Sequence, residues 1–168
     1  MPGKIIVGVM GPGEGATPDE NEMAFDLGQA IGREGWITLT GGRSFGIMDA
    51  ALKGAVASGG LTIGVLPGDS EKNASENAQI KIITSMGSGR NYISVLSSHV
   101  LVVLGMAAGT ASEVALAIKS SKRVILLNQD EDTIRFFKKI GSYKVMISST
   151  VEDTIRQIKD YLIVNPVK

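Results

Sequence analysis

Short apolar runs alternate with segments of helical spacing along this chain, and this alternation constrains its fold most. Runs rich in Val, Ile and Leu predict strands over residues 5–10, 36–40, 61–66, 80–84, 100–104, 124–128 and 144–147. Between them, the spacing predicts helices over residues 19–34, 46–58, 90–97, 110–120, 132–139 and 150–162. The middle strands are apolar on both faces, so helices should cover both sides of the sheet. The sequence therefore predicts an α/β fold, a Rossmann-like doubly wound sandwich with a mostly parallel sheet of about seven strands.

Length and composition indicate one domain over residues 1–168. With 43% hydrophobic residues and no cysteine, the chain can bury a core without disulfides or a structural metal. A net charge of +0 gives no basic surface for nucleic acid or for an anionic membrane. The apolar runs are too short to cross a bilayer and no cleavable signal is visible, so we expect a cytoplasmic protein.

The segment from Gly105 to Glu113 has the composition of an anion site. It follows the apolar run of residues 99–104 and continues into an apolar helical segment. Small residues allow a tight turn there, and the next helix directs free backbone N–H groups and its positive dipole end into that turn. Thr110 adds a hydroxyl donor, whereas the carboxylate of Glu113 repels phosphate and needs another partner. Phosphate is the expected ligand.

Four glycine-containing loops follow predicted strands, at residues 11–15, 41–46, 85–91 and 105–110. Carboxyl ends of parallel strands meet at one edge of a sheet, so we expect these loops to converge around a ligand. For a single loop, the alternative that its glycines only close a βα turn has equal weight. The candidate ligand-binding residues are Gly11, Gly41, Gly42, Arg43, Ser44, Gly46, Met86, Gly87, Arg90, Asn91, Gly105, Ala108, Gly109, Thr110 and Glu113.

Arg90 is the cation in these loops that most indicates a ligand. It begins a predicted helix, where the dipole disfavours a cation, so an anionic ligand or a carboxylate such as Glu113 should accompany it. A surface ion pair is the alternative. Asn91 can address a base or a pterin, or cap its own helix turn. The single histidine, His99, begins a strand and is predicted to be a packed or edge residue without a catalytic triad.

Two common nucleotide motifs are absent from the sequence. Residues 11–16 lack the Gly-x-Gly-x-x-Gly spacing, and Thr40-Gly41 stands where a dinucleotide fold places an acidic residue. This argues against NAD. No Gly-Lys-Ser/Thr follows any strand, so ATP hydrolysis is unsupported. The polar residues 67–77 predict a long loop, either a lid or binding edge or a plain solvated excursion.

Several motifs together resemble the LOG superfamily of Rossmann-like proteins. They are Gly-Gly-Arg-x-x-Gly-Ile-Met-x-Ala from Gly41, Gly-Ala at residues 54–55, Gly-Val-Leu-Pro-Gly at residues 64–68, Gly-Arg-Asn at residues 89–91, and Gly-Thr-x-x-Glu from Gly109. The resemblance covers nearly the whole chain and implies a ligand that carries a phosphate. Two branches compete, the cytokinin-activating phosphoribohydrolases and the molybdenum cofactor carriers.

Departures from the hydrolase motifs favour the carrier branch. The hydrolases carry Pro-Gly-Gly-x-Gly-Thr-x-x-Glu and an Arg-Lys pair, whereas this chain has Met106-Ala107-Ala108-Gly109 and Arg90-Asn91. The resemblance to the carriers implies a protein that binds, protects and carries the molybdenum cofactor, without catalytic residues or a protein-bound metal. The pterin's phosphate would lie on Gly109, Thr110 and the loop of residues 41–44. Arg90 and Asn91 would contact the pterin or its anionic head.

The alternative is a phosphoribohydrolase acting on AMP or cytokinin ribotides, with Arg90 and Glu113 as its catalytic residues. In either case the resemblance implies a homo-oligomer, a dimer or a tetramer, whose partner is a small phosphate-bearing pterin or nucleotide.

Overall fold

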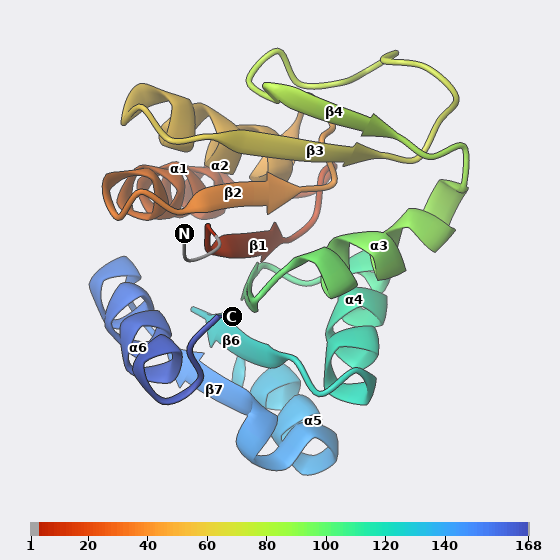
Figure 1. The fold of residues 1–168 in the computed structure, drawn as a ribbon. Helices are drawn as coiled ribbons and strands as arrows, with labels where there is room; N and C mark the ends of the chain where they lie inside the picture. Colours follow the sequence, from red (N-terminus) through yellow and green to blue (C-terminus); the bar gives the residue numbers. More distant parts are fainter. Residues whose placement is uncertain (1–3, 168) are drawn as a thin grey trace.

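The computed structural model describes residues 4–167 and has the predicted order of strands and helices (Figure 1). The ends of the predicted domain, residues 1–3 and 168, lie outside the described residues. No predicted end of a strand or helix differs from the observed one by more than two residues. The strands are β1 Ile6–Met10, β2 Ile37–Thr40, β3 Thr62–Leu66, β4 Ile80–Ile83, β5 Val100–Leu104, β6 Arg123–Leu127 and β7 Val145–Ser148. The helices are α1 Pro18–Arg33, α2 Gly46–Ala57, α3 Arg90–Ser97, α4 Ala108–Lys119, α5 Glu131–Gly141 and α6 Val151–Val164, with the short 3₁₀ turns η1 Gly87–Gly89 and η2 Ser142–Lys144.

The strands form one seven-stranded sheet in the order β4-β3-β2-β1-β5-β6-β7, and every neighbouring pair is parallel. The chain first builds outward from β1 to β4 and then restarts beside β1 with β5. Loops that leave β1 and β5 therefore depart to opposite sides, which opens a crevice at their carboxyl ends. The predicted doubly wound Rossmann-like sandwich is confirmed.

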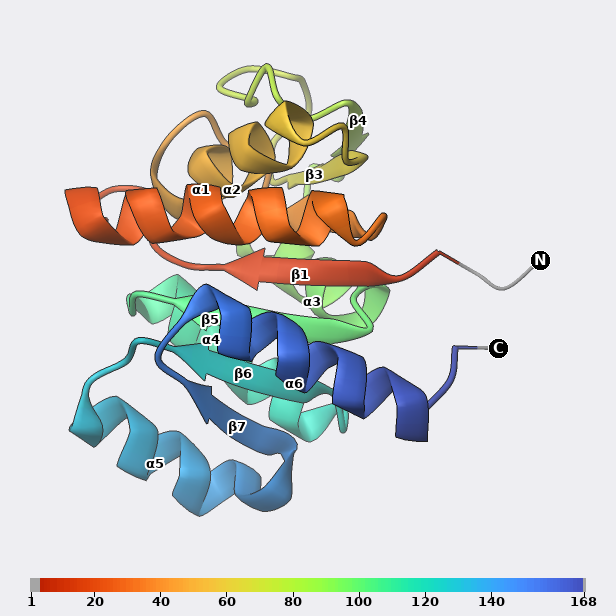
Figure 2. The same cartoon turned by 90° about the vertical axis from the view of Figure 1, so that its left-hand side faces the viewer.

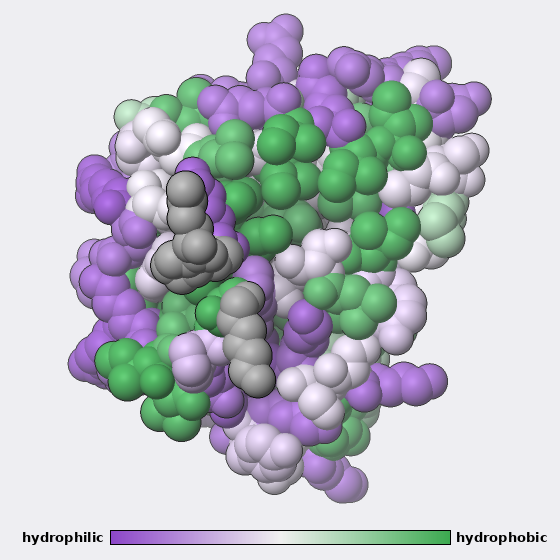
Figure 3. All heavy atoms as spheres, viewed as in Figure 1, coloured by the Kyte–Doolittle hydropathy of each residue, from purple (hydrophilic) through white to green (hydrophobic). Residues whose placement is uncertain are grey.

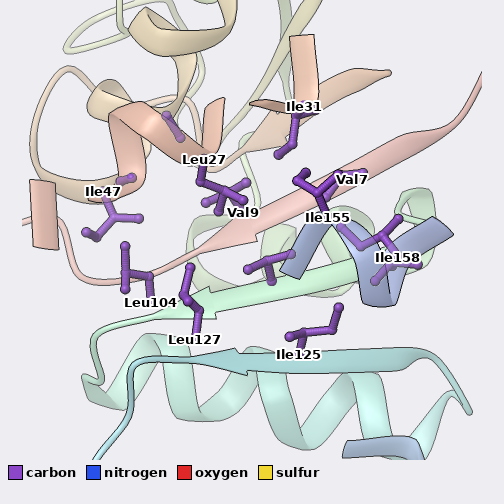
Figure 4. Close-up of a cluster of buried hydrophobic side chains, with 14 residues drawn as sticks. Val7, Val9, Leu27, Ile31, Ile47, Leu104, Ile125, Leu127, Ile155 and Ile158 are labelled. Atoms are coloured by element: carbon purple, nitrogen blue, oxygen red, sulfur yellow. The ribbon is translucent and has the colours of Figure 1, made fainter. Parts of the chain in front are cut away.

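Two apolar cores lie on the two faces of the sheet. On one face, Val100, Val102 and Leu104 of β5 belong to the core that also contains residues of α1, α2 and α6 (Figure 4). The alternate residues Leu101 and Val103 belong to the core that contains residues of α3, α4 and α5. Figure 2 shows α1, α2 and α6 together on the face of the sheet that is turned to the viewer. A central strand that is apolar at every position is thus explained by burial on both sides.

Side-chain caps start the first and last helices. The Thr17 hydroxyl accepts a hydrogen bond from the Glu20 backbone N–H, and the Glu20 carboxylate accepts one from the Thr17 N–H, which completes a capping box. Thr150 caps α6 by accepting from the N–H of Asp153. The N-terminus of α4 has no such side-chain cap.

The polar loop of residues 67–77 is held against the second glycine-containing loop. Arg43 and Ala74 form an antiparallel bridge, and Ser75 donates its backbone N–H to the carbonyl of Gly42. The Ser75 hydroxyl also donates to the Asp49 carboxylate on α2 at 2.5 Å. These contacts tether the loop to the segment after β2 and to α2.

Apolar side chains are exposed on the edge strand β4. Ile80, Ile82 and Ile83 are 44%, 39% and 46% exposed. In the space-filling view, apolar residues gather over the region where β3, β4 and the start of α3 lie in Figure 1 (Figure 3). Exposed apolar patches of this kind mark interaction surfaces.

Among the described residues, no helix is long and apolar enough to span a bilayer.

Candidate functional site

A cavity of about 210 Å³ lies in the crevice beyond the carboxyl ends of β1 and β5. Four loops meet there, those that follow β1, β2, β4 and β5, as the parallel sheet requires. The lining residues are Val9, Met10, Gly11, Pro12, Gly13, Gly41, Met48, Arg90, Asn91, Ala107, Gly109, Thr110 and Glu113.

The N-terminus of α4 contributes backbone donors to this cavity. The helix begins at Ala108, and the preceding Ala107 has no side chain that can cap it. The first intrahelical bond is donated by Ala111 to the Ala107 carbonyl at 2.8 Å, so the N–H groups of residues 108–110 have no partner within the helix. Thr110 lines the cavity and is 3% exposed. The arrangement provides amide donors and a helix dipole for an anion.

Arg90, the first residue of α3, brings a cation to the same cavity. Its guanidinium packs on Gly41, where a Cβ atom would come within 2.2 Å of Nη1, so Gly41 makes room for it. The Nε atom is buried and has no hydrogen-bond partner among the described residues. Burial lowers the pKa of Arg90, Glu113 raises it, and Arg43 lowers it further. A guanidinium that is buried with unused donors is suited to an anionic ligand.

Glu113 faces Arg90 across the cavity. Its Oε1 lies 4.0 Å from Nη1 of Arg90, and the two side chains are 8% and 11% exposed. This distance is longer than a hydrogen bond, so the pair interacts only through charge. Burial raises the pKa of Glu113 to about 7, and the attraction of Arg90 opposes that rise. Near neutral pH the carboxyl is therefore divided between its protonated and ionised forms.

Asn91 joins α3 to α4. Its Nδ2 donates to the Ser112 hydroxyl at 3.2 Å, and that hydroxyl donates to the Gly109 carbonyl at 2.6 Å. The side chain of Asn91 thus positions the start of α4, a role beyond the two that the sequence indicated.

A second cavity of about 250 Å³ adjoins the first and is lined by Arg43, Pro67, Gly87, Ser88, Arg90, Asn91 and Gly109. Arg90, Asn91 and Gly109 line both cavities. Arg43 is exposed, and its guanidinium lies over the ring of Phe45, 5.5 Å from its centroid. The two cavities together offer room for a ligand larger than one ring system.

A third and larger cavity, of about 450 Å³, lies between α1 and the start of α6. Its wall carries the carboxylates of Asp19, Glu22, Asp26 and Glu152, with Arg33 as the cation. This groove repels phosphate, so charge distinguishes it from the crevice at β1 and β5.

The model of the SLOG cluster4 family matches residues 4–155 of the chain. The chain belongs to this family. The family match and the similarities below confirm the LOG-superfamily resemblance.

Solved structures and a curated relative resemble this SLOG cluster4 protein over most of its length. The molybdenum cofactor binding protein of Rippkaea orientalis is 48% identical with a TM-score of 0.94, covering 95% of this chain and 98% of its own. The molybdenum cofactor carrier protein of Chlamydomonas reinhardtii is 46% identical with a TM-score of 0.92, covering 96% and 99%. An uncharacterised protein of Archaeoglobus fulgidus is 39% identical over 121 residues, or 72% of this chain and 78% of the relative. The chain is thus similar to molybdenum cofactor carriers.

The structure gathers many of the predicted site residues of this family member around the two cavities. Gly11, Gly41, Arg90, Asn91, Gly109, Thr110 and Glu113 line the first cavity, and Arg43 and Gly87 line the second. Gly42, Ser44, Gly46, Met86, Gly105 and Ala108 line neither one.

The three glycines among these six residues serve the packing of the chain. Gly42 has φ +72° and would place a Cβ atom 2.8 Å from the Cα of Gly64 on β3. Gly46 has φ +64° and approaches the carbonyl of Gly13, while Gly105 has φ +67° and approaches Pro12. These positions need glycine for the turn itself.

The candidate residues did not include Val9, Met10, Pro12, Gly13 and Ala107, which line the first cavity. Pro12, Gly13 and Ala107 do belong to loops that were predicted to converge there, whereas Val9 and Met10 do not. Val9 and Met10 end an apolar strand and are indistinguishable there from core residues. Their position directly before a glycine-containing loop was the available indication. Met48, in the first turn of α2, also lines the cavity.

His99 lies at the amino end of β5, away from this crevice. Its Nδ1 accepts a hydrogen bond from the Ile6 backbone N–H at 2.9 Å, which joins β1 to the start of β5. Within residues 4–167, no group of three or more His, Cys, Asp and Glu side chains is arranged to hold a metal ion.

Proposed function

We propose that this protein binds, protects and carries the molybdenum cofactor in the crevice beyond β1 and β5. The observation that carries the proposal is an identity of 46–48% to molybdenum cofactor binding and carrier proteins over at least 95% of the chain. The metal belongs to the cargo, so the protein itself needs only to hold the organic part. In this proposal the cofactor stays within the two adjoining cavities, where the walls limit its contact with water.

The residues present fit a phosphate-bearing ligand. A phosphate can satisfy three uncapped backbone N–H groups at the start of α4 and the Nε of Arg90, which has no partner among the residues that the structure describes. Thr110 adds a hydroxyl from the same helix turn. In our proposal, the phosphate lies at Gly109 and Thr110, and Arg90 neutralises its charge.

Anaerobic titration with isolated molybdenum cofactor tests this function. We expect saturable binding to the wild type and about ten-fold weaker binding to Thr110→Val, which keeps the shape of the side chain but loses one hydrogen bond to a charged group. Thr133→Val is a matched control, because Thr133 is also the third residue of its helix. It belongs to α5, whose N-cap Asp130 accepts a hydrogen bond from the Thr133 backbone N–H. Absence of binding to the wild type would contradict the proposal.

A phosphoribohydrolase is a second candidate, because Arg90 and Glu113 share the cavity and the pKa of about 7 for Glu113 suits proton transfer. Incubation with AMP distinguishes the two. Release of free base and ribose 5-phosphate that disappears in Glu113→Gln would assign hydrolysis in place of carriage.

We propose further that copies of the chain assemble through the apolar surface of β4. Sedimentation velocity should show a dimer or tetramer for the wild type and a monomer for Ile82→Asp, which places a charge in this surface. Phe136→Asp is the control, because Phe136 is also an exposed apolar residue, at 57%, but lies on α5. A wild type that sediments as a monomer would refute this assembly.

A further inference from the structure

Of the residues in the range 4–167, Glu113 is the one acidic residue that lines the two adjoining cavities. The contact to Arg90 at 4.0 Å is too long for a hydrogen bond, and the carboxyl side chain is 8% exposed. Among the described residues, no hydrogen bond to this carboxyl is present, and burial raises its pKa while the charge of Arg90 opposes that rise. A buried carboxyl without hydrogen bonds costs stability, and such groups concentrate at functional sites. The phosphate of the proposed ligand does not explain it, because a carboxylate repels phosphate.

The walls beside Glu113 favour a planar ring. Val9, Met10, Pro12 and Met48 line the same cavity, and Met10 and Met48 are 2% and 8% exposed. Flat heterocycles pack well against such apolar and thioether surfaces. The anionic part of a ligand is drawn instead to the amides of α4 and to Arg90, which also borders the second cavity.

We propose that Glu113 selects the heterocycle of the ligand by accepting two parallel hydrogen bonds from a 2-amino-4-oxo-pyrimidine ring, the donor pattern that pterins and guanine share. The inference rests on the proposed function, because it assigns the ring of the same ligand to the cavity of Glu113. The phosphate of the ligand then lies at Gly109 and Thr110, beside Arg90, and the rest of the ligand extends toward the cavity of Arg43 and Ser88, which Gly109 also lines.

The selectivity follows from the pattern of donors. The amino group and the adjacent ring N–H of a pterin point the same way, so each can donate to one carboxylate oxygen, as an arginine fork does. Lumazine carries a carbonyl oxygen in place of the amino group and would set a lone pair against the carboxylate. Adenine offers one donor and one acceptor. A carboxylate therefore accepts the first ring and rejects the other two.

The test compares pterin with lumazine, which differ at this one position. We expect the wild type to bind pterin about 10- to 100-fold more tightly than lumazine, as hydrogen bonds to a charged group require. Glu113→Gln presents one acceptor and one donor, so the preference should disappear or reverse in favour of lumazine. Equal binding of both rings to the wild type, no detectable binding of pterin, or an unchanged preference in Glu113→Gln would each overturn the inference.

A pH series adds a readout that a purely structural role would not move. Arg90 on α3 is the charged group that faces Glu113, and Arg43 from the loop after β2 acts in turn on Arg90. Because the ionised carboxyl accepts the hydrogen bonds, pterin affinity should rise several-fold between about pH 6 and about pH 7.5 in the wild type and stay flat in Glu113→Gln.

Two nucleotides identify the source of the ring. Preference for GMP over AMP with weak binding of pterin would point to a guanine nucleotide, whereas tight binding of pterin points to a pterin cargo. Different results would refute the role of Glu113 and the carrier function. Retention of the molybdenum cofactor without any pterin preference refutes the role of Glu113 alone, and pterin selection without cofactor retention refutes the carrier function alone.

Discussion

Arg90→Ala is expected to weaken binding of the molybdenum cofactor by about 30- to 100-fold. The substitution removes a guanidinium that lies in the wall shared by both cavities, with its side chain 11% exposed. Its Nε has no hydrogen-bond partner in the described part of the chain. Charge-assisted hydrogen bonds of this type contribute about 2–3 kcal/mol when little water competes. Anaerobic titration followed by absorbance measures the change in affinity.

Two further variants make this result specific. Arg90→Lys keeps the positive charge but not the planar fork, so it should recover only part of the affinity. Arg33→Ala removes an arginine from the acidic groove at α1 and should bind like the wild type. Wild-type affinity in Arg90→Ala, with an unchanged melting temperature, would show that the cofactor does not contact this arginine.

Glu113→Gln is expected to abolish a pH dependence of stability worth about 3 kcal/mol. The pKa of Glu113 is about 7 in the folded protein and 4.5 in the reference state, and its side chain is 8% exposed. Between these values the folded state binds more protons than the unfolded one, so stability falls as the pH rises through this window. Below it both states are protonated and the penalty vanishes, while above it the penalty is complete.

The measurement is the free energy of unfolding in urea at several pH values between about 4.5 and about 8. The difference between wild type and Glu113→Gln isolates this carboxyl, because other titrating groups are common to both proteins. Glu22→Gln, an exposed glutamate on α1, controls for the loss of one carboxylate. A constant difference between wild type and Glu113→Gln across the series would show that the carboxyl is not held in a desolvated environment.

Much of the fold follows from the spacing of apolar residues. Residues 100–104 are apolar throughout, and the structure buries alternate members of β5 in opposite cores. The helix predicted from Thr110 begins two residues earlier, at Ala108. The prediction missed this start because alanine and glycine carry no capping side chain that would mark it. Lys144 was predicted to begin the last strand but belongs to η2. No local feature of the sequence marks the start of that strand.

The candidate site was harder to predict than the fold because glycine has two uses. At Gly41 it makes room for the Arg90 guanidinium, whereas at Gly42 and Gly46 it allows turns in which the backbone approaches other backbone atoms. A sequence shows the same letter for both. The residues of the cavity that carry charge, Arg90 and Glu113, were identifiable since a cation at a helix start and a carboxylate after a phosphate turn both need a partner.

The apolar members of the site could not be recognised from sequence. Met10 is 2% exposed and belongs to the core on the α3–α5 face, yet it also lines the cavity. Only the restart of the sheet at β5 opens the space beside it. The position of a strand within the sheet therefore decides whether such a residue is core, ligand contact or both.

A crystal structure of the protein grown anaerobically with the molybdenum cofactor tests the central claim most directly. We predict density for the cofactor beyond β1 and β5, with its phosphate at the N–H groups of Gly109 and Thr110 and within reach of Arg90. Density in the acidic groove between α1 and α6, or a crevice that holds only solvent at saturating cofactor, would contradict the account.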